Sequence, residues 1–297
     1  MITYLFFRLL VFKLRFVPFT LLYVLSDFFS FVIFKIFKYR VKVINANLRR
    51  AFPEKPDSEI QQIERKFYKH FTDITLESLK GFSCSPQKLK KRYLFLNTVS
   101  TDTYFEQGKN IIIAAGHYGN WEWGPLALTG QMKHLPIGLY KPLKNKYIDS
   151  YIRRNRAKWG AMVAPIENTR FVFTNKPEKP LAVAFIADQS PSNTRKAIWI
   201  KFLNQDTACL HGLEFYSKMY NTPVIYFAIN RVKRGYYEVS GTEIAQYPND
   251  CADNAITQKY MQLLEEQIMA NPQFWLWSHK RWKHKRTADN EIIRENI

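Results

Sequence analysis

A histidine and a glutamate separated by four residues form the clearest candidate for chemistry in this sequence. His117 and Glu122 lie in IIIAAGHYGNWEWG at 111–124, directly after a short β-branched run. The run predicts a buried strand, and the glycines that follow predict a turn at its tip. Residues five apart do not share one helical face, so we expect the carboxylate to reach the imidazole across the turn. An imidazole held at one nitrogen can take a proton from a hydroxyl at the other.

A histidine near an acid also fits a purely structural turn, but the surrounding residues resemble a known sequence box. His117 and Glu122, within GHYGNWEW, resemble the H-x4-D/E box of the glycerolipid and lipid A acyltransferases. The glutamate version is most similar to the lauroyl and myristoyl transferases of lipid A biosynthesis. The resemblance covers residues from about 45 to about 285. It implies that His117 is a general base and that Glu122 fixes its tautomer.

Composition and charge narrow the class of partner. The chain has 297 residues, of which 46% are hydrophobic and 16% aromatic, so it is long and apolar enough for one folded α/β domain with an appendage. Its formal net charge of +19 requires an anionic partner. No helix-turn-helix, RNP-type or zinc-finger signature is present, and the cations border apolar runs. We therefore expect a membrane surface and no nucleic acid. Three distant cysteines fit neither a disulfide framework nor a metal site.

The N-terminal region predicts a membrane anchor. The segment 16–34 holds nineteen residues with Asp27 as its only charge, which is about the length that crosses a hydrocarbon core. Asp27 and Pro18 weaken a spanning interpretation, so a spanning helix and a monotopic arrangement both remain open. We expect residues 1–42 to form this anchor and residues 43–297 the acyltransferase domain. Basic residues are more numerous after the segment, which favours a cytoplasmic catalytic domain.

The rest of the chain predicts an α/β fold with a mixed, mostly parallel sheet flanked by helices. Apolar runs at 111–115, 135–140, 161–165, 181–187, 198–202 and 223–229 alternate with helical stretches. An antiparallel edge strand is expected at 236–244. The resemblance implies the same architecture, that of the glycerolipid acyltransferases.

Three further groups of residues fall where such a sheet places its site. Arg153, Arg154 and Arg156 follow a predicted strand and form either a phosphate-binding cluster or a solvated basic face. Asp188 lies at the end of another predicted strand. Three roles fit an acid at this position, namely a helix cap, a charge partner for the arginines, or a polar wall of the site. The C-terminal stretch NPQFWLWSHKRWK at 271–283 fits an interfacial belt, a site for an anionic lipid, or a strand or helix packed on the sheet.

The resemblance to the lipid A acyltransferases assigns roles to these groups. The arginine of that family that binds substrate matches Arg156 best, with Arg153 and Arg154 as alternatives, and its acid matches Asp188. The implied reaction moves a fatty acyl chain from acyl carrier protein to a hydroxyl of a lipid A precursor at the inner membrane, with the catalytic domain on the cytoplasmic face. No cofactor or metal is expected, because the thioester arrives activated.

Two other functions remain open from the sequence. A lysophospholipid or aminoacyl-lipid acyltransferase would use the same His117 and Glu122 on another acceptor. A non-catalytic basic protein that binds membranes or nucleic acid would explain the charge and the anchor without any chemistry.

Overall fold

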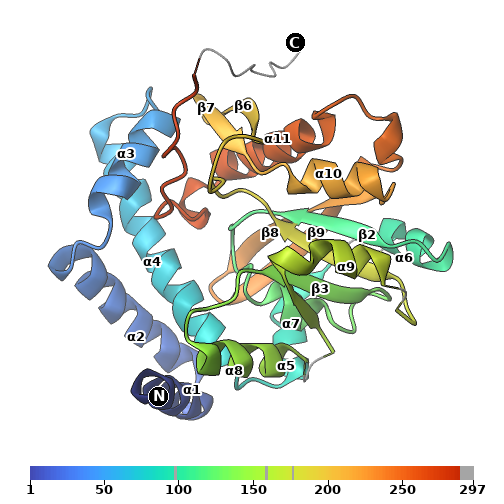
Figure 1. Cartoon of the computed structure of the whole chain (residues 1–297). Helices are drawn as coiled ribbons and strands as arrows, with labels where there is room; N and C mark the ends of the chain where they lie inside the picture. Colours follow the sequence, from blue (N-terminus) through green and yellow to red (C-terminus); the bar gives the residue numbers. More distant parts are fainter. Residues whose placement is uncertain (97–98, 158–159, 176, 288–297) are drawn as a thin grey trace.

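The computed structural model describes residues 1–96, 99–157, 160–175 and 177–287, and it is built around a seven-stranded sheet (Figure 1). The strand order is β1-β9-β8-β2-β5-β3-β4, and every neighbouring pair is parallel except the antiparallel pair β8 and β9. The strands of this sheet are β1 (Tyr93–Phe95), β2 (Ile111–Ala115), β3 (Leu135–Tyr140), β4 (Met162–Pro165), β5 (Leu181–Ile186), β8 (Val224–Lys233) and β9 (Tyr236–Ala245). The expected mixed, mostly parallel sheet is therefore confirmed.

Two strand predictions need correction. β9 is antiparallel to β8 as expected, but it is not the edge, because the short strand β1 pairs on its other side. The predicted strand at 198–202 is β6 (Ile198–Phe202), which leaves the main sheet and forms a separate hairpin with β7 (Gln205–Cys209).

Helices cover both faces of the sheet. They are α3 (Val41–Ala51), α4 (Asp57–Gly81), α5 (Pro86–Lys90), α6 (Val99–Glu106), α7 (Gly124–Leu128), α8 (Lys146–Ala157), α9 (Thr169–Thr174), α10 (Gly212–Met219) and α11 (Ala255–Ala270). Short 3₁₀ turns lie at Ile166–Asn168, Pro248–Asp250 and Pro272–Phe274.

The middle strand β2 is buried between the helices on the two faces of the sheet. All five of its residues are buried, because a parallel strand in the middle of such a sheet is covered on both faces. Ile112 and Ala114 pack into the cluster that contains residues of α3, α4 and α11. Ile111 and Ile113 face the other cluster, with residues of α5, α6 and α7. This double burial fixes the direction in which the strand delivers the residues that follow it.

The N-terminal helices lie along one side of the body. α1 (Ile2–Phe16) is followed by α2 (Phe19–Phe31), which runs on as a π-helical turn at Val32–Ile36. Figure 1 shows α2 beside α4, and α2 buries Leu22, Ser26 and Ser30 on the side that faces the body. By length and composition alone, Phe19–Ile36 is the one described helix that could cross a membrane.

Candidate active site

The candidate site lies where two neighbouring strands of the sheet end. β2 and β5 pair in parallel, with Ala115 opposite Ile186 at their carboxyl ends. His117 and Asp188 each come two residues after these strand ends, so the strand register brings both side chains to the same edge. The carboxyl edge of a parallel α/β sheet is the usual place for a site.

His117 is held by Asp188. The imidazole Nδ1 lies 2.6 Å from Asp188 Oδ1, and the backbone N–H of His117 donates to Asp188 Oδ2 at 3.0 Å. Trp275 Nε1 donates to the same Oδ2 at 2.8 Å. The Asp188 side chain is 2% exposed, so these donors replace the water that an ionised carboxylate needs. The carboxylate therefore fixes both the position of the ring and the proton on Nδ1.

The second imidazole nitrogen of His117 faces Gln189. With the proton on Nδ1, Nε2 carries a lone pair, and the amide Nε2 of Gln189 lies 3.1 Å from it as the donor. The His117 side chain is 18% exposed, so this nitrogen lies at the rim of the site. An incoming hydroxyl must take the place of the Gln189 amide before it can give its proton to the imidazole.

The charges of this pair shift both of its pKa values. Burial alone would raise the pKa of Asp188, but the imidazole charge and three donated hydrogen bonds lower it to about 2. For His117, burial acts to lower the pKa, but the carboxylates of Asp188 and Glu122 outweigh it and raise the pKa above its usual value. Asp188 thus stays ionised and stabilises the imidazolium that forms when His117 accepts a proton.

The structure differs from the expectation that Glu122 would reach back to the imidazole. Glu122 Oε2 pairs instead with Arg156 Nη2 on α8 at 3.0 Å. The chain passes through irregular turns between Gly119 and Gly124, and the ring of Trp121 packs edge-on against His117, 5.2 Å between centroids. The Nδ1 side of His117 is occupied by Asp188, so Glu122 affects the imidazole only through its charge.

The three predicted arginines lie in different surroundings. Arg156 is mostly buried and turned toward Glu122, whereas Arg154 is exposed on α8. Arg153 is also exposed, and its Nε pairs with Asp149 one turn earlier at 3.2 Å. The structure therefore brings together four of the predicted site residues, namely His117, Glu122, Arg156 and Asp188, and leaves Arg153 and Arg154 on the surface.

The turn predicted after His117 is present, and it is fixed in part by Glu77, which the sequence did not single out. Gly119 has φ of +60°, and a Cβ there would lie 2.9 Å from the backbone oxygen of Ile229, so only glycine fits. Asn120 is buried and donates to Glu77 Oε2 on α4 at 2.7 Å. The hydroxyls of Tyr23 and Tyr237 also donate to the Glu77 carboxylate, at 2.9 and 2.8 Å. Glu77 thus joins α2, α4, β9 and the catalytic turn.

Glu77→Leu is expected to lower both the melting temperature and the transfer rate. The substitution leaves three donors without an acceptor, of which those of Asn120 and Tyr237 are buried and each cost about 1–3 kcal/mol, and it releases Asn120 from the turn. Glu77→Gln keeps one acceptor oxygen and should fall between the leucine variant and the wild type. Thermal unfolding and acyl-transfer assays measure the two effects. Glu59→Gln, on an exposed position of the same helix, is the control and should change neither.

The C-terminal segment closes the site from the other side. The tryptophans of the WLWSHKRWK stretch do not form an interfacial belt, because Trp275 and Trp277 are buried in the main core. The backbone N–H of Leu276 donates to the carbonyl of His117 at 3.1 Å, and Trp275 forms an isolated antiparallel β-bridge with Tyr118. Of the alternatives from the sequence, packing on the sheet is the observed one.

An apolar cavity begins beside His117. Its lining includes Ala115, which precedes the catalytic turn, and Trp121, which packs on the imidazole. Further lining residues come from β1, β2, β3, β5, α7, β8 and β9, among them Tyr93, Ile113, Leu128, Ile137, Ala184 and Phe227. In the described part of the chain, no group of three or more His, Cys, Asp or Glu side chains is placed to hold a metal ion. The arrangement suits a proton transfer next to an apolar group.

Comparison with known proteins identifies the family. A family model described as bacterial lipid A biosynthesis acyltransferase matches residues 1–284. The Haemophilus influenzae lipid A biosynthesis acyltransferase is 22% identical over 254 residues, covering 84% of this chain and 79% of the relative. The Escherichia coli lipid A biosynthesis lauroyltransferase is 20% identical over 272 residues, covering 90% and 86%.

A second Escherichia coli relative, the lipid A biosynthesis palmitoleoyltransferase, is 18% identical over 259 residues, covering 86% of this chain and 82% of its own. The identities are low, but the matches span most of each chain, and the family match includes both the N-terminal helices and the site at His117. The chain belongs to the bacterial lipid A biosynthesis acyltransferases and is therefore a transferase.

Proposed function

We propose that the protein transfers a fatty acyl chain from acyl carrier protein to a hydroxyl of a lipid A precursor, on the cytoplasmic face of the inner membrane. The observation that carries this proposal is the hydrogen bond between His117 Nδ1 and Asp188, which leaves Nε2 as a base at the rim of the site. The acceptor class follows from the relatives, all of which are named for lipid A biosynthesis.

The chemistry proceeds by general-base catalysis. The acceptor hydroxyl displaces the amide of Gln189 from His117 Nε2 and gives up its proton as its oxygen attacks the thioester carbonyl. The C–S bond then breaks, and the imidazolium returns the proton to the departing thiolate. Asp188 remains ionised throughout, because its pKa lies at about 2. The thioester is already activated, so this sequence needs no metal or bound cofactor.

The apolar cavity has the lining to contact the acyl chain of the donor, but its volume of about 50 Å³ holds only the first carbons beside the carbonyl. Trp121 contributes both to its lining and to the contact with His117, so a chain in the cavity would place its carbonyl next to the base. The net charge of +19 favours encounter with the strongly acidic acyl carrier protein. Arg156 lies on α8, where Glu122 accepts one of its N–H donors, and the guanidinium has further donors for a phosphate of the acceptor.

Arg156→Ala is expected to raise the KM for the lipid acceptor by about 10- to 100-fold, because it removes hydrogen bonds from the guanidinium to the acceptor phosphate. The KM for the thioester should change little, because the lining of the proposed acyl cavity contains no residue of α8. Arg154→Ala is the matched control, since Arg154 lies two positions earlier on the same helix but is exposed. Steady-state kinetics with each substrate varied in turn measure the difference. Equal effects of both variants would count against a phosphate role for Arg156.

The assignment of the acceptor is tested on the native lipids. Mass spectrometry of lipid A from cells with and without the gene should show one acyl chain missing in its absence. Purified enzyme should restore the chain to the isolated precursor when labelled acyl carrier protein thioester is supplied. Unchanged lipid A, together with an acyl chain missing from a phospholipid or an amino-acid lipid, would move the assignment to that acceptor.

A further inference from the structure

The N-terminal helices each carry an exposed apolar face with no protein partner in the described structure. More than half of the exposed large apolar side chains lie within the first 37 residues. On α2, Leu21, Val24, Phe28 and Phe31 are exposed at spacings of three, four and three residues, so they share one face. On α1, an exposed stripe follows the same kind of spacing at Leu5, Leu9, Phe12 and Phe16. We call these eight residues the outer stripe.

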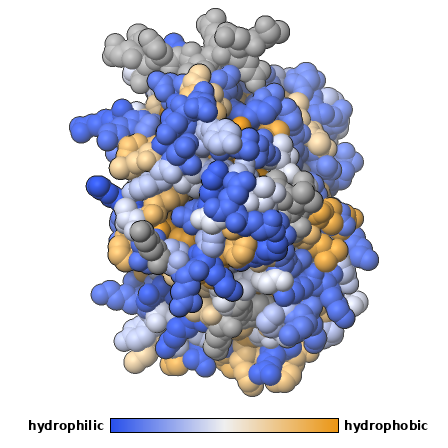
Figure 2. All heavy atoms as spheres, turned by 90° about the vertical axis from the view of Figure 1, so that its right-hand side faces the viewer, coloured by the Kyte–Doolittle hydropathy of each residue, from blue (hydrophilic) through white to orange (hydrophobic). Residues whose placement is uncertain are grey.

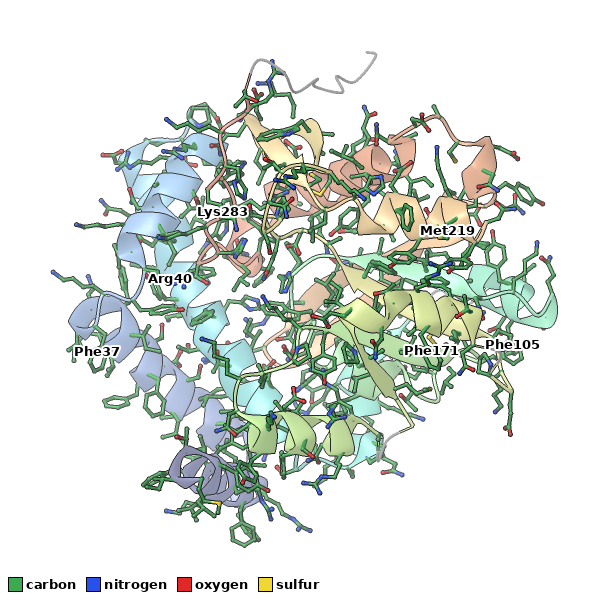
Figure 3. The ribbon with its side chains drawn as sticks, viewed as in Figure 1. Phe37, Arg40, Phe105, Phe171, Met219 and Lys283 are labelled. Carbon is green, nitrogen blue, oxygen red and sulfur yellow. The ribbon has the colours of Figure 1, made fainter. Side chains whose placement is uncertain are left out.

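The outer stripe lies on one side of the molecule only. Phe37, labelled in Figure 3, lies at the outer edge of this region and is 74% exposed. Figure 2 shows the opposite face, where hydrophilic residues cover most of the surface and apolar residues form small separate patches. The apolar area at the N-terminus is therefore a local feature and not a general property of the surface.

The inner side of α2 is polar and tied to the catalytic body. Ser26 Oγ donates to Asp73 Oδ1 at 2.6 Å, and Tyr23 donates to Glu77. Asp27 pairs with Arg234 at 2.8 Å, and Arg234 also contacts Asp73 at 2.7 Å. Asp73 and Glu77 are buried on α4, so their partners on α2 supply contacts that water cannot.

These contacts conflict with a span across the bilayer. Tyr23, Ser26 and Asp27 lie near the middle of the apolar stretch Phe19–Ile36. If that stretch crossed the membrane, Asp27 would lie close to the bilayer midplane. Either its ion pair with Arg234, in the turn between β8 and β9, would break, or the body would follow it into hydrocarbon. A helix that lies in the plane of the interface keeps every inner contact and still buries the outer stripe.

We propose that α1 and α2 form a monotopic platform that lies in one leaflet of an anionic bilayer, with both ends of α2 on the same side of the membrane. Exposed cations flank the outer stripe, including Lys13 and Arg15 on α1 and Lys35 and Lys38 beyond α2. Their charge is complementary to anionic headgroups, and their apolar stems can lie along the interface.

The platform also contacts the helix that carries Arg156. Tyr4 and Phe7 of α1 pack on Tyr147 and Tyr151 of α8, at 5.7 and 5.4 Å between ring centroids. The contact lies in the first half of α8, and Arg156 lies in its last turn. If Arg156 binds the acceptor, as the proposed function has it, the platform therefore holds the phosphate-binding helix beside the leaflet in which a lipid acceptor diffuses. The acceptor then needs only to tilt toward His117 and does not have to leave the membrane.

Membrane topology is tested by labelling single cysteines. In a background with Cys84→Ser, Cys209→Ala and Cys251→Ser, the variants Lys13→Cys and Lys42→Cys place exposed thiols before and after α2. A membrane-impermeant maleimide is applied to spheroplasts and to inverted vesicles. Both positions should react in the same preparation. Reaction of the two positions in opposite preparations would show a spanning helix and overturn the proposal.

Vesicle binding tests the outer stripe in the wild-type cysteine background. The double variant Leu21→Glu/Phe28→Glu should bind vesicles of phosphatidylethanolamine and phosphatidylglycerol about 100-fold more weakly, with an unchanged melting temperature. The control Phe171→Glu/Met219→Glu adds the same charge at residues labelled in Figure 3 away from α2, with similar exposures of 65% and 49% against 61% and 47% for Phe28 and Leu21. The control should bind as the wild type does. Equal losses in both variants, or none in the first, would refute the platform.

Discussion

The His117→Ala variant is expected to transfer acyl groups about 100- to 10,000-fold more slowly than the wild type, with membrane binding retained. The imidazole Nε2 is the only side-chain nitrogen in our scheme that removes the proton of the acceptor, and alanine provides no substitute. Alanine also removes the imidazole donor to Asp188 and leaves only the backbone N–H of residue 117 and Trp275 Nε1, so the melting temperature should fall. Single-turnover transfer from a labelled thioester measures the chemical step.

The His117→Asn variant separates the loss of the catalytic base from the loss of a hydrogen-bond donor to Asp188. An asparagine amide can still donate to Asp188, but it cannot act as a base at neutral pH. This variant should therefore recover the melting temperature lost in the alanine variant while it stays as slow. Turnover close to that of the wild type in either variant would rule out His117 as the base.

The wild-type rate should rise with pH through the pKa of His117. The base must be neutral to accept a proton, and Asp188 and Glu122 raise the pKa of His117 despite its burial. The ascending limb of the rate profile should then lie above the ordinary histidine value of about 6.5. A limb below that value would mean that burial outweighs the carboxylates.

Much of the site could be predicted from local sequence alone. A β-branched run followed by Gly116 and His117 marks the tip of a buried strand, and Asp188 ends a second run of the same kind. Because the carboxyl ends of parallel strands share one edge, both residues were expected near the same site. Glu77 also left a signal. The helix α4 has buried apolar residues at helical spacing, at Ile60, Ile63, Phe67 and Ile74, and Glu77 continues this face three residues after Ile74, where a charge is out of place.

The partner of His117 could not be predicted in this way. The pattern H-x4-E gives a local spacing, whereas the observed contact joins residues 71 positions apart. It depends on β2 and β5 being neighbours in the sheet, and neither strand contains information on its neighbour. The hairpin of β6 and β7 was missed for a different reason. Its turn residues Leu203 and Asn204 have φ of +48° and +64°, and leucine is not a residue that marks such a turn.

The Asp188→Asn variant is expected to lose about 100- to 10,000-fold in transfer rate, although it removes no group that touches the substrate. The carboxylate accepts from His117 Nδ1 on one oxygen and from the His117 backbone and Trp275 on the other. If the asparagine NH₂ faces the imidazole, the ring proton moves to Nε2 and the base is lost. If its oxygen faces the imidazole, the NH₂ opposes two buried N–H donors, and the negative charge that stabilises the imidazolium is still missing.

Two companion variants show which carboxylate supports His117. Trp275→Phe removes one donor to Asp188 but keeps the contact with Nδ1, so it should cost no more than about tenfold, near the worth of one hydrogen bond. Glu122→Gln should also cost less than Asp188→Asn, because Glu122 pairs with Arg156 and acts on the imidazole only through its charge. In Asp188→Asn the ascending limb of the rate profile should move to lower pH, since the main cause that raises the pKa of His117 is gone. If Glu122→Gln is the slower variant, and the limb moves with Glu122 and not with Asp188, then the glutamate reaches the imidazole during turnover, as the spacing in the sequence first indicated.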